Sequence, residues 1–181
     1  MKILLHCCCG PCAIYPLKRL RTAGYQVHGY YYNHIHPYTE WQLRLTTLKE
    51  YAGSHELPLI TDDRYRLVYF SRQTVYRETT RCSFCYHDRL TATAKIAKRG
   101  HFDAFTSTLL YSKFQKHELI QEIGVAVGKS VGVQFFYEDF RRGWQEGIAI
   151  SREQQMYRQQ YCGCIFSEGE RYLGKNFLLD E

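Results

Sequence analysis

Apolar and polar positions follow two alternating periodicities along the chain, and their order predicts parallel strands connected by helices. A short apolar run at residues 3–5 and a Val- and Tyr-containing run at residues 25–32 favour extended backbone. Between them, apolar residues recur at helical spacing over residues 13–23, and Gly24 stands where a helix typically ends. A strand, a helix and a strand within so short a stretch form a βαβ unit, whose two strands are parallel.

The same periodicities predict the elements that follow. We expect strands over residues 57–60, 102–106 and 133–136, and helices over residues 39–55, 81–99 and 117–129, with mixed helical character over 64–80. The sequence Thr39-Glu40-Trp41-Gln42 has the pattern of a capping box at the start of its helix.

After residue 137 the regular pattern ends. Residues 139–147 are polar and interrupted by glycine, which predicts a mobile loop, and short helices are expected over residues 151–160 and 168–173. The predicted fold class is therefore α/β, a parallel sheet flanked by helices in one domain over residues 1–181. The C-terminal helical segment would fold back over the edge at which the strands end.

The composition narrows the class of protein. Apolar residues make up 45% of the 181 residues, enough for a real core, and no apolar run approaches the ~20 residues of a membrane helix. We therefore expect a cytoplasmic protein without a membrane partner. A net charge of +6, with Lys, Arg and aromatic residues interleaved between Arg64 and Arg99, suits phosphate contact and base stacking. A solvated helix face would have the same composition.

Eight cysteines in a reducing compartment indicate metal ligation or redox chemistry rather than a disulfide framework. They form three groups: Cys7, Cys8, Cys9 and Cys12; Cys82 and Cys85; Cys162 and Cys164. On the predicted elements the first two groups open helices, where the helix dipole favours a thiolate, and the third ends one. Two converging groups would form an all-thiolate site, for which the spacing favours a [4Fe–4S] cluster over the zinc alternative.

Individual residues of this constellation allow more than one interpretation. A Cys162–Cys164 disulfide would close a small, strained and reducible ring, and alternatively both thiolates could bind a second metal. Cys7 is expected to be a buried thiol, because alternate strand residues face opposite sides. Three histidines at the presumed site edge are candidate site members: His6, His34 and His36.

Two other classes of protein share part of this pattern. Cys9-Gly10-Pro11-Cys12 has the form of the thioredoxin signature, so a thioredoxin-like thiol oxidoreductase using Cys9 and Cys12 is one alternative. A zinc-stabilised RNA-binding module is the other. The first leaves the remaining cysteine groups unexplained, and the second does not account for thiols at the carboxyl edge of a parallel sheet.

Five motifs, in order along nearly the whole chain, resemble the QueH family of cobalamin-independent epoxyqueuosine reductases. They are Leu4–Cys12, Tyr31–Glu40, Arg81–Leu90, Thr106–Ser112 and Tyr157–Cys164. The resemblance implies a HUP or PP-loop-like (adenine nucleotide alpha-hydrolase-like) sheet and reduction of epoxyqueuosine to queuosine at the tRNA wobble position. Cys7 is an additional thiol, and residues 111–116 replace an expected Ser-Pro-x-Lys-like loop, which puts the role of Lys113 or Lys116 in doubt.

The resemblance also implies roles for particular residues. Cys8, Cys9, Cys82 and Cys85 would hold a [4Fe–4S] cluster. Cys162 and Cys164 would be a redox-active pair or ligands of an adjacent mononuclear iron, and Cys12 would suit a ligand of that second metal. The partners would be a tRNA substrate, not DNA, and an unidentified electron donor. As a hypothesis, four arginines would contact tRNA phosphates: Arg81, Arg89, Arg141 and Arg142.

Overall fold

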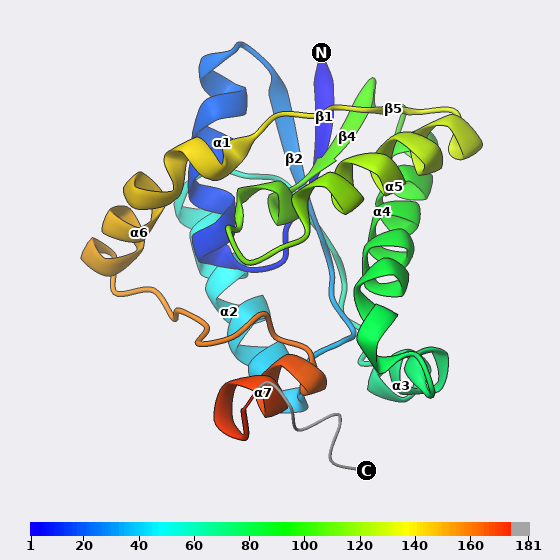
Figure 1. The fold of residues 1–181 in the computed structure, drawn as a ribbon. Helices are drawn as coiled ribbons and strands as arrows, with labels where there is room; N and C mark the ends of the chain where they lie inside the picture. Colours follow the sequence, from blue (N-terminus) through cyan, green and yellow to red (C-terminus); the bar gives the residue numbers. More distant parts are fainter. Residues whose placement is uncertain (175–181) are drawn as a thin grey trace.

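A five-stranded, all-parallel sheet forms the centre of the computed structural model, which describes residues 1–174 (Figure 1). The strands lie in the order β3-β2-β1-β4-β5. Their bounds are β1 (Lys2–His6), β2 (Gln26–Tyr32), β3 (Leu59–Asp62), β4 (Ala104–Ser107) and β5 (Gln134–Phe135).

Helices cover both faces of the sheet (Figure 1). One face carries α1 (Gly10–Thr22), α2 (Tyr38–Ser54) and α6 (Trp144–Glu153), and the other carries α4 (Arg81–Arg99) and α5 (His117–Val131). Two short helices, α3 (Leu67–Thr74) and α7 (Ile165–Tyr172), lie near the end of the molecule at which the strands finish. Single 3-10 turns connect these elements: η1 (Glu78–Thr80), η2 (Thr108–Tyr111) and η3 (Phe140–Gly143). No described helix is both long and apolar enough to cross a membrane.

The central strand β1 explains the apolar run of the sequence. Ile3, Leu4 and Leu5 have no exposed surface, because helices pack on both faces of the sheet. A strand buried on both faces must be apolar at every position and therefore loses the alternation of a half-exposed strand. The predicted βαβ unit is confirmed, including Gly24 in the left-handed conformation just beyond α1.

The strand order places a topological switch point beside β1. Strands β2 and β3 continue to one side of β1, whereas β4 and β5 lie on the other. The chain segments that leave β1 and β4 therefore diverge and open a crevice, where such sheets bind their ligands. Across this crevice the backbone N–H of Cys8 donates to Thr108 Oγ1 at 3.0 Å.

Several expectations about the local structure are wrong. Helix α2 has Pro37 at its N-cap and no side-chain cap, so the capping box does not form. The loop expected over residues 139–147 is η3 followed by α6, because Gly143 packs against the Tyr15 ring and Gly147 against Tyr111. These glycines permit close packing rather than mobility. The cysteine pair at 162–164 opens a helix instead of ending one, since Cys164 is the N-cap of α7.

Candidate metal centre

Three buried thiols gather where β1 gives way to α1. The sulfur atoms of Cys8, Cys9 and Cys12 all lie within 4.8 Å of one another, and none of the eight cysteines forms a disulfide. Cys9 is the extended N-cap of α1, and Cys12 lies one helical turn further on, so both side chains reach the same point. Gly10 permits this tight entry, because a Cβ there would lie 2.8 Å from the side chain of Met156.

These thiols strongly affect one another's acidity. Hydrogen bonds with Cys12 and Cys9 lower the pKa of Cys8 well below its usual value. The pKa of Cys12 is raised because its proton is held by Cys8, and burial raises the pKa of Cys9 to about 12. A thiophilic metal ion bound by all three would displace the remaining protons, since thiolates are the ligating species.

A buried arginine lies beside this group. Arg44 is only 1% exposed, and its Nε donates to Glu40 Oε1 at 2.5 Å. Burial alone would lower the pKa of Arg44, but negative charge on Cys9, Glu40 and Cys8 raises it, so the guanidinium stays charged. It supplies a fixed positive charge to any thiolate site formed by Cys8 and Cys9.

A second set of thiols forms at the N-terminus of α4. Cys82 and Cys85 are one turn apart, and Cys85 is buried, which raises its pKa. Gln115 connects this helix to the C-terminal pair, because its Oε1 accepts from Tyr86 of α4 at 2.7 Å and its Nε2 lies 3.1 Å from Cys162 Sγ. Within that pair Cys162 is exposed and Cys164 is buried.

Arg89 links the two thiol sets. It is 2% exposed and hydrogen-bonded to Asn33 Oδ1, and Asn33 in turn donates to the carbonyl oxygen of Cys8 at 2.8 Å. Burial would lower the pKa of Arg89, whereas charge on Cys85, Cys8 and Cys162 raises it. The charge of Arg89 is thus coupled to one cysteine from each of the three groups.

The grouping differs in detail from the ligand set that the family resemblance implied. In residues 1–174 the structure finds one group of three potential metal ligands in mutual contact, and it contains Cys12 rather than Cys82 or Cys85. Because a cluster would stand between its ligands, sulfurs that bind it need not touch one another. The assignment of Cys8, Cys9, Cys82 and Cys85 to one cluster therefore stays a prediction.

Two glutamines donate to the thiols, and sequence reasoning assigned no role to either. Gln159 Nε2 lies 3.3 Å from Cys9 Sγ and 3.5 Å from Cys12 Sγ. Gln115 Nε2 lies 3.1 Å from Cys162 Sγ. The only signal for Gln159 was its place in the motif Tyr157–Cys164, because it lies 150 positions from Cys9 in the sequence.

The Gln115 amide is oriented by its neighbours. The backbone N–H of Lys116 donates to the Tyr86 hydroxyl oxygen at 3.2 Å, and Tyr86 donates its own proton to Gln115 Oε1 at 2.7 Å. Because Oε1 is occupied as an acceptor, Nε2 is the atom that faces Cys162. Hydrogen bonds of this kind to sulfur tune the potential of metal–thiolate sites.

Burial lowers the pKa of all three candidate histidines, and two of them, His6 and His36, bond to neighbouring segments at the edge of the sheet. His6 Nε2 donates to the Tyr32 carbonyl at 3.2 Å, while its Nδ1 accepts from the Ser107 hydroxyl at 2.9 Å, so it links β1, β2 and β4. Burial lowers the pKa of His6 to about 4 and that of His34 to about 3. His36 Nδ1 donates to the carbonyl of Gly163 at 2.6 Å.

The arginines expected to contact RNA phosphates differ in accessibility. Arg81 is buried and paired with Glu170, and Arg89 is buried on Asn33, so neither offers a free guanidinium at the surface. Arg141 is half-buried and bonded through two nitrogens to Asp139. Arg142 is exposed.

Comparison with known proteins connects this site to a family. A family profile described as epoxyqueuosine reductase QueH matches residues 3–170. The chain is 36% identical over 172 residues to an epoxyqueuosine reductase QueH of Dehalococcoides mccartyi, with 94% of each chain covered. It is 33% identical to the Thermotoga maritima protein of the same name, over 93% of this chain and 91% of that one. A Staphylococcus aureus protein of that name is 30% identical, over 92% of this chain and 75% of its own. The chain therefore belongs to the QueH family of epoxyqueuosine reductases.

Proposed function

We propose that this chain is an iron–sulfur-dependent epoxyqueuosine reductase that converts epoxyqueuosine at the tRNA wobble position to queuosine. The observation that carries the proposal is the buried, unpaired thiol group of Cys8, Cys9 and Cys12 at the switch point of the sheet. It lies in a chain that matches the QueH family over residues 3–170.

The residues present fit a [4Fe–4S] cluster. Cys8, Cys9, Cys82 and Cys85 would hold it, and soft thiolates are the ligands that iron–sulfur clusters require. The buried guanidinium of Arg89, on which charge from both Cys8 and Cys85 acts, would compensate the negative charge of such a site. When bound, the cluster would supply electrons one at a time.

The overall reaction fixes what the surrounding residues must do. Removing the epoxide oxygen breaks two C–O bonds, forms a C=C bond, consumes two electrons and two protons, and releases the oxygen as water. The chain must therefore hold the substrate beside its thiols and deliver protons there. Cys162 is the exposed thiol of the site and is the one that an incoming nucleotide would meet.

Two roles are open to Cys162 and Cys164, and both are part of the proposal. They would act as a redox-active pair, or they would bind an adjacent mononuclear iron together with Cys12. Support for the second role comes from Gln159, which precedes Cys162 in the chain and whose amide lies 3.5 Å from Cys12 Sγ, so the C-terminal segment reaches Cys12. The two roles differ in the iron content that they require.

We further propose that the sheet is of the HUP or PP-loop type and that residues 1–181 form one domain. The parallel order β3-β2-β1-β4-β5 and the position of the thiols beyond β1 support the fold type. The bonds from Arg44 on α2 to the backbone of residues 161 and 162 support a single unit. The remaining partners are the tRNA substrate and an electron donor.

Iron and acid-labile sulfide, measured with a visible spectrum on protein purified without oxygen, test the proposal. We expect about four irons and four sulfides, lost in Cys82→Ala and kept in Cys162→Ala. A fifth iron lost only in Cys162→Ala would select the mononuclear iron, and its absence would select the redox pair. Zinc alone, or no metal, would overturn the reductase mechanism. Zinc would then favour the zinc-stabilised RNA-binding module, and absence of metal would favour the thioredoxin-like oxidoreductase. Formation of queuosine in epoxyqueuosine-containing tRNA, under a chemical reductant, tests the reaction itself.

A further inference from the structure

One exposed phenylalanine lies beside the thiols. Phe114 is 82% exposed, on the loop of residues 112–116 between η2 and α5. The next residue along the chain is Gln115, whose amide contacts Cys162. Burying a phenylalanine side chain stabilises a protein by about 1.5–3 kcal/mol. Exposing Phe114 next to the site forgoes this stabilisation, which indicates a functional role for the ring.

The loop holds Phe114 in a defined place. The backbone N–H of Phe114 donates to Ser112 Oγ at 3.2 Å, and its ring stands at 77° to the Trp144 ring with the centroids 5.7 Å apart. Gln115 fixes the other side through Tyr86 and Cys162. One face of the ring is therefore free while the loop around it is anchored.

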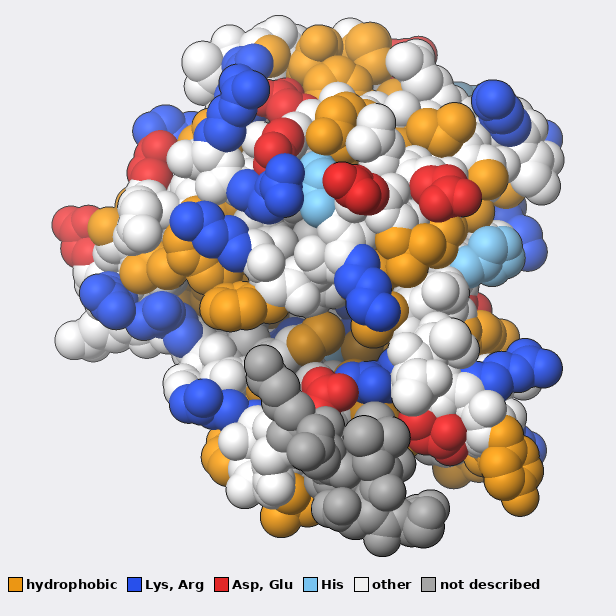
Figure 2. Space-filling view, in the orientation of Figure 1, with side chains coloured by type: hydrophobic (Ala, Val, Ile, Leu, Met, Phe, Trp, Pro, Cys, Tyr) orange, Lys and Arg blue, Asp and Glu red, His pale blue; other side chains and the backbone are white. Residues whose placement is uncertain are grey.

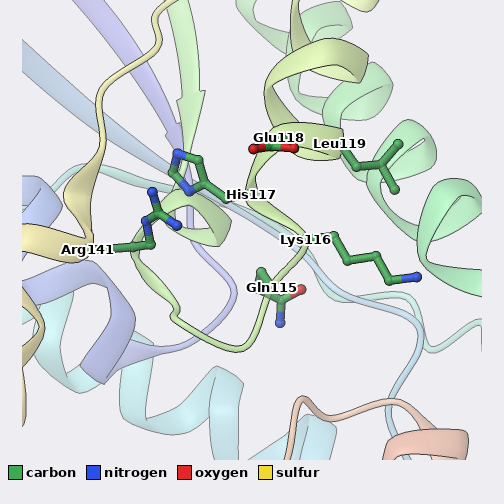
Figure 3. A pocket seen from close by; sticks show the side chains of 6 residues that line it. All are labelled: Gln115, Lys116, His117, Glu118, Leu119 and Arg141. Atoms are coloured by element: carbon green, nitrogen blue, oxygen red, sulfur yellow. The ribbon is translucent and has the colours of Figure 1, made fainter.

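The surroundings of Phe114 are basic and hollow. Lys113 and Lys116 are exposed and form no ion pair with any residue in the described part of the chain. A cavity of about 330 Å³ begins directly after Phe114, and its lining residues are shown in Figure 3: Gln115, Lys116, His117, Glu118, Leu119 and Arg141. In that view Gln115 points toward the C-terminal segment, whereas Lys116 points toward α4.

Basic side chains elsewhere do not form an alternative platform on the face seen in Figure 2. There, Lys and Arg are scattered among acidic and apolar side chains rather than gathered into one stripe. An aromatic ring flanked by two unpaired lysines is the combination by which proteins bind single-stranded nucleic acid, since every base has a face to stack and every nucleotide a phosphate.

We propose that the 112–116 loop is the element that grips the anticodon loop: Phe114 stacks on a base next to the wobble nucleotide, and Lys113 and Lys116 neutralise adjacent phosphates. This inference rests on the proposed function, which supplies the RNA. The short path from Phe114 through Gln115 to Cys162 brings the neighbouring nucleotide to the exposed thiol. Arg81 and Arg89, which are buried, are not needed for the grip.

The test is binding of an RNA hairpin that carries epoxyqueuosine in its anticodon loop and a fluorescent purine analogue at the adjacent base. We expect Phe114→Ala to weaken binding by roughly ten- to a hundredfold and to relieve quenching of the analogue, and Phe114→Tyr to restore both. Lys113→Gln and Lys116→Gln should each reduce the slope of log K against log salt by about 0.7. Lys129→Gln, an exposed lysine at the far end of α5, should leave the slope unchanged.

Queuosine formation is measured in parallel, so that the two proposals fail separately. A wild-type chain that forms queuosine, while Phe114→Ala binds and quenches the hairpin as the wild type does, overturns the role of the loop alone. Unchanged hairpin binding with slower turnover under a protein reductant would assign Phe114 to the electron donor instead. If hairpin binding depends on Phe114 but no queuosine is formed, the proposed reaction is overturned and the RNA-binding role of the 112–116 loop is supported. Absence of saturable binding by the wild type overturns the inference outright.

Discussion

The buried guanidinium of Arg44 donates to the carbonyl oxygen of Cys162 at 3.1 Å. Its second terminal nitrogen donates to the carbonyl of Tyr161 at 3.2 Å, and His36 donates to the next carbonyl, that of Gly163. Three consecutive carbonyls of the C-terminal turn are thereby held by side chains of α2 and the segment before it. The position of Cys162 is set by residues more than a hundred positions away.

Replacing Arg44 should release this turn. Arg44→Met leaves the buried Glu40 carboxylate without its cationic partner, with the Tyr157 hydroxyl as a remaining donor, and we expect a loss of about 3–5 kcal/mol in the free energy of unfolding. Arg44→Lys keeps the charge but not the three-way donation, so about 1–3 kcal/mol should be lost and alkylation of Cys162 should accelerate. Urea unfolding and timed alkylation measure both effects. The exposed Arg72→Lys is the control, and equal stability of Arg44→Met and wild type would refute the clamp.

Gly163 should tolerate no side chain. Its φ is +117°, and a Cβ there would run into the His36 ring and the guanidinium carbon of Arg44. We expect Gly163→Ala to lower the free energy of unfolding by about 1–2 kcal/mol through added backbone strain and by about 1–3 kcal/mol more through overpacking. Gly24→Ala is a matched control, because Gly24 has φ +81° with nothing within 4 Å of its Cβ position. Thermal unfolding should show the larger loss for Gly163→Ala, and equal losses would contradict the predicted clash.

Two buried cysteines should differ in their effect on metal content. Cys12 Sγ belongs to the contact group with Cys8 and Cys9, whereas Cys7 Sγ donates to the Leu5 carbonyl at 3.3 Å and lies outside it. Where Cys12 binds the adjacent mononuclear iron, Cys12→Ala should lose that iron and keep the cluster, whereas Cys7→Ala should leave the iron content unchanged. The Cys7→Ala protein should unfold more easily, by about 1 kcal/mol, because a small cavity remains. Iron analysis and unfolding curves, measured on both variants, distinguish a metal ligand from a structural thiol. Iron loss in Cys7→Ala alone would make Cys7 rather than Cys12 the ligand.

Acid should destabilise the fold through His34. Burial lowers the pKa of His34 from 6.5 to about 3. As the pH falls below 6.5, His34 is therefore protonated in the unfolded chain but not in the native chain. The contribution is fully present above pH 6.5 and is lost as the pH falls toward 3, at up to about 1.4 kcal/mol per pH unit. His34 Nε2 faces Asp88 at 3.2 Å, and burial raises the pKa of that carboxyl, which opposes the trend.

The comparison between variants isolates the histidine. Unfolding free energies measured between pH 4 and 8 should fall less steeply for His34→Gln than for the wild type. Identical profiles for His34→Gln and wild type would show that His34 is not the group that titrates.

The sequence was informative wherever a residue's role depends on its near neighbours. Helix α4 was predicted over 81–99 and is confirmed there, because an apolar stripe and a following Gly100 mark it locally. The thiols beyond β1 were placed correctly because a parallel strand must end at the ligand edge. The chain order of strands and helices followed from the same periodicities.

Contacts across long stretches of chain could not be predicted in this way. Helical spacing places Arg44 on the same face of α2 as Trp41 and Leu48, but a buried arginine looks like a solvated one in sequence, so its inward charge was not predicted. Gln159 and Gln115 reach thiols far away in the chain, and amides have no spacing signature. The start of α7 was missed because Cys164 caps it with its sulfur, a role seldom filled by cysteine.

The bond from Gln159 to Cys9 joins residues 150 positions apart, and this separation has a consequence for how the protein is made. At about 5–20 residues per second, synthesis of the intervening chain takes roughly 8 to 30 seconds. Throughout that interval the thiols after β1 have emerged without the segment that later lies over them. The growing chain therefore presents its most oxidisable side chains before it can shield them, so the yield of active protein should depend on the oxygen present during translation rather than only during purification.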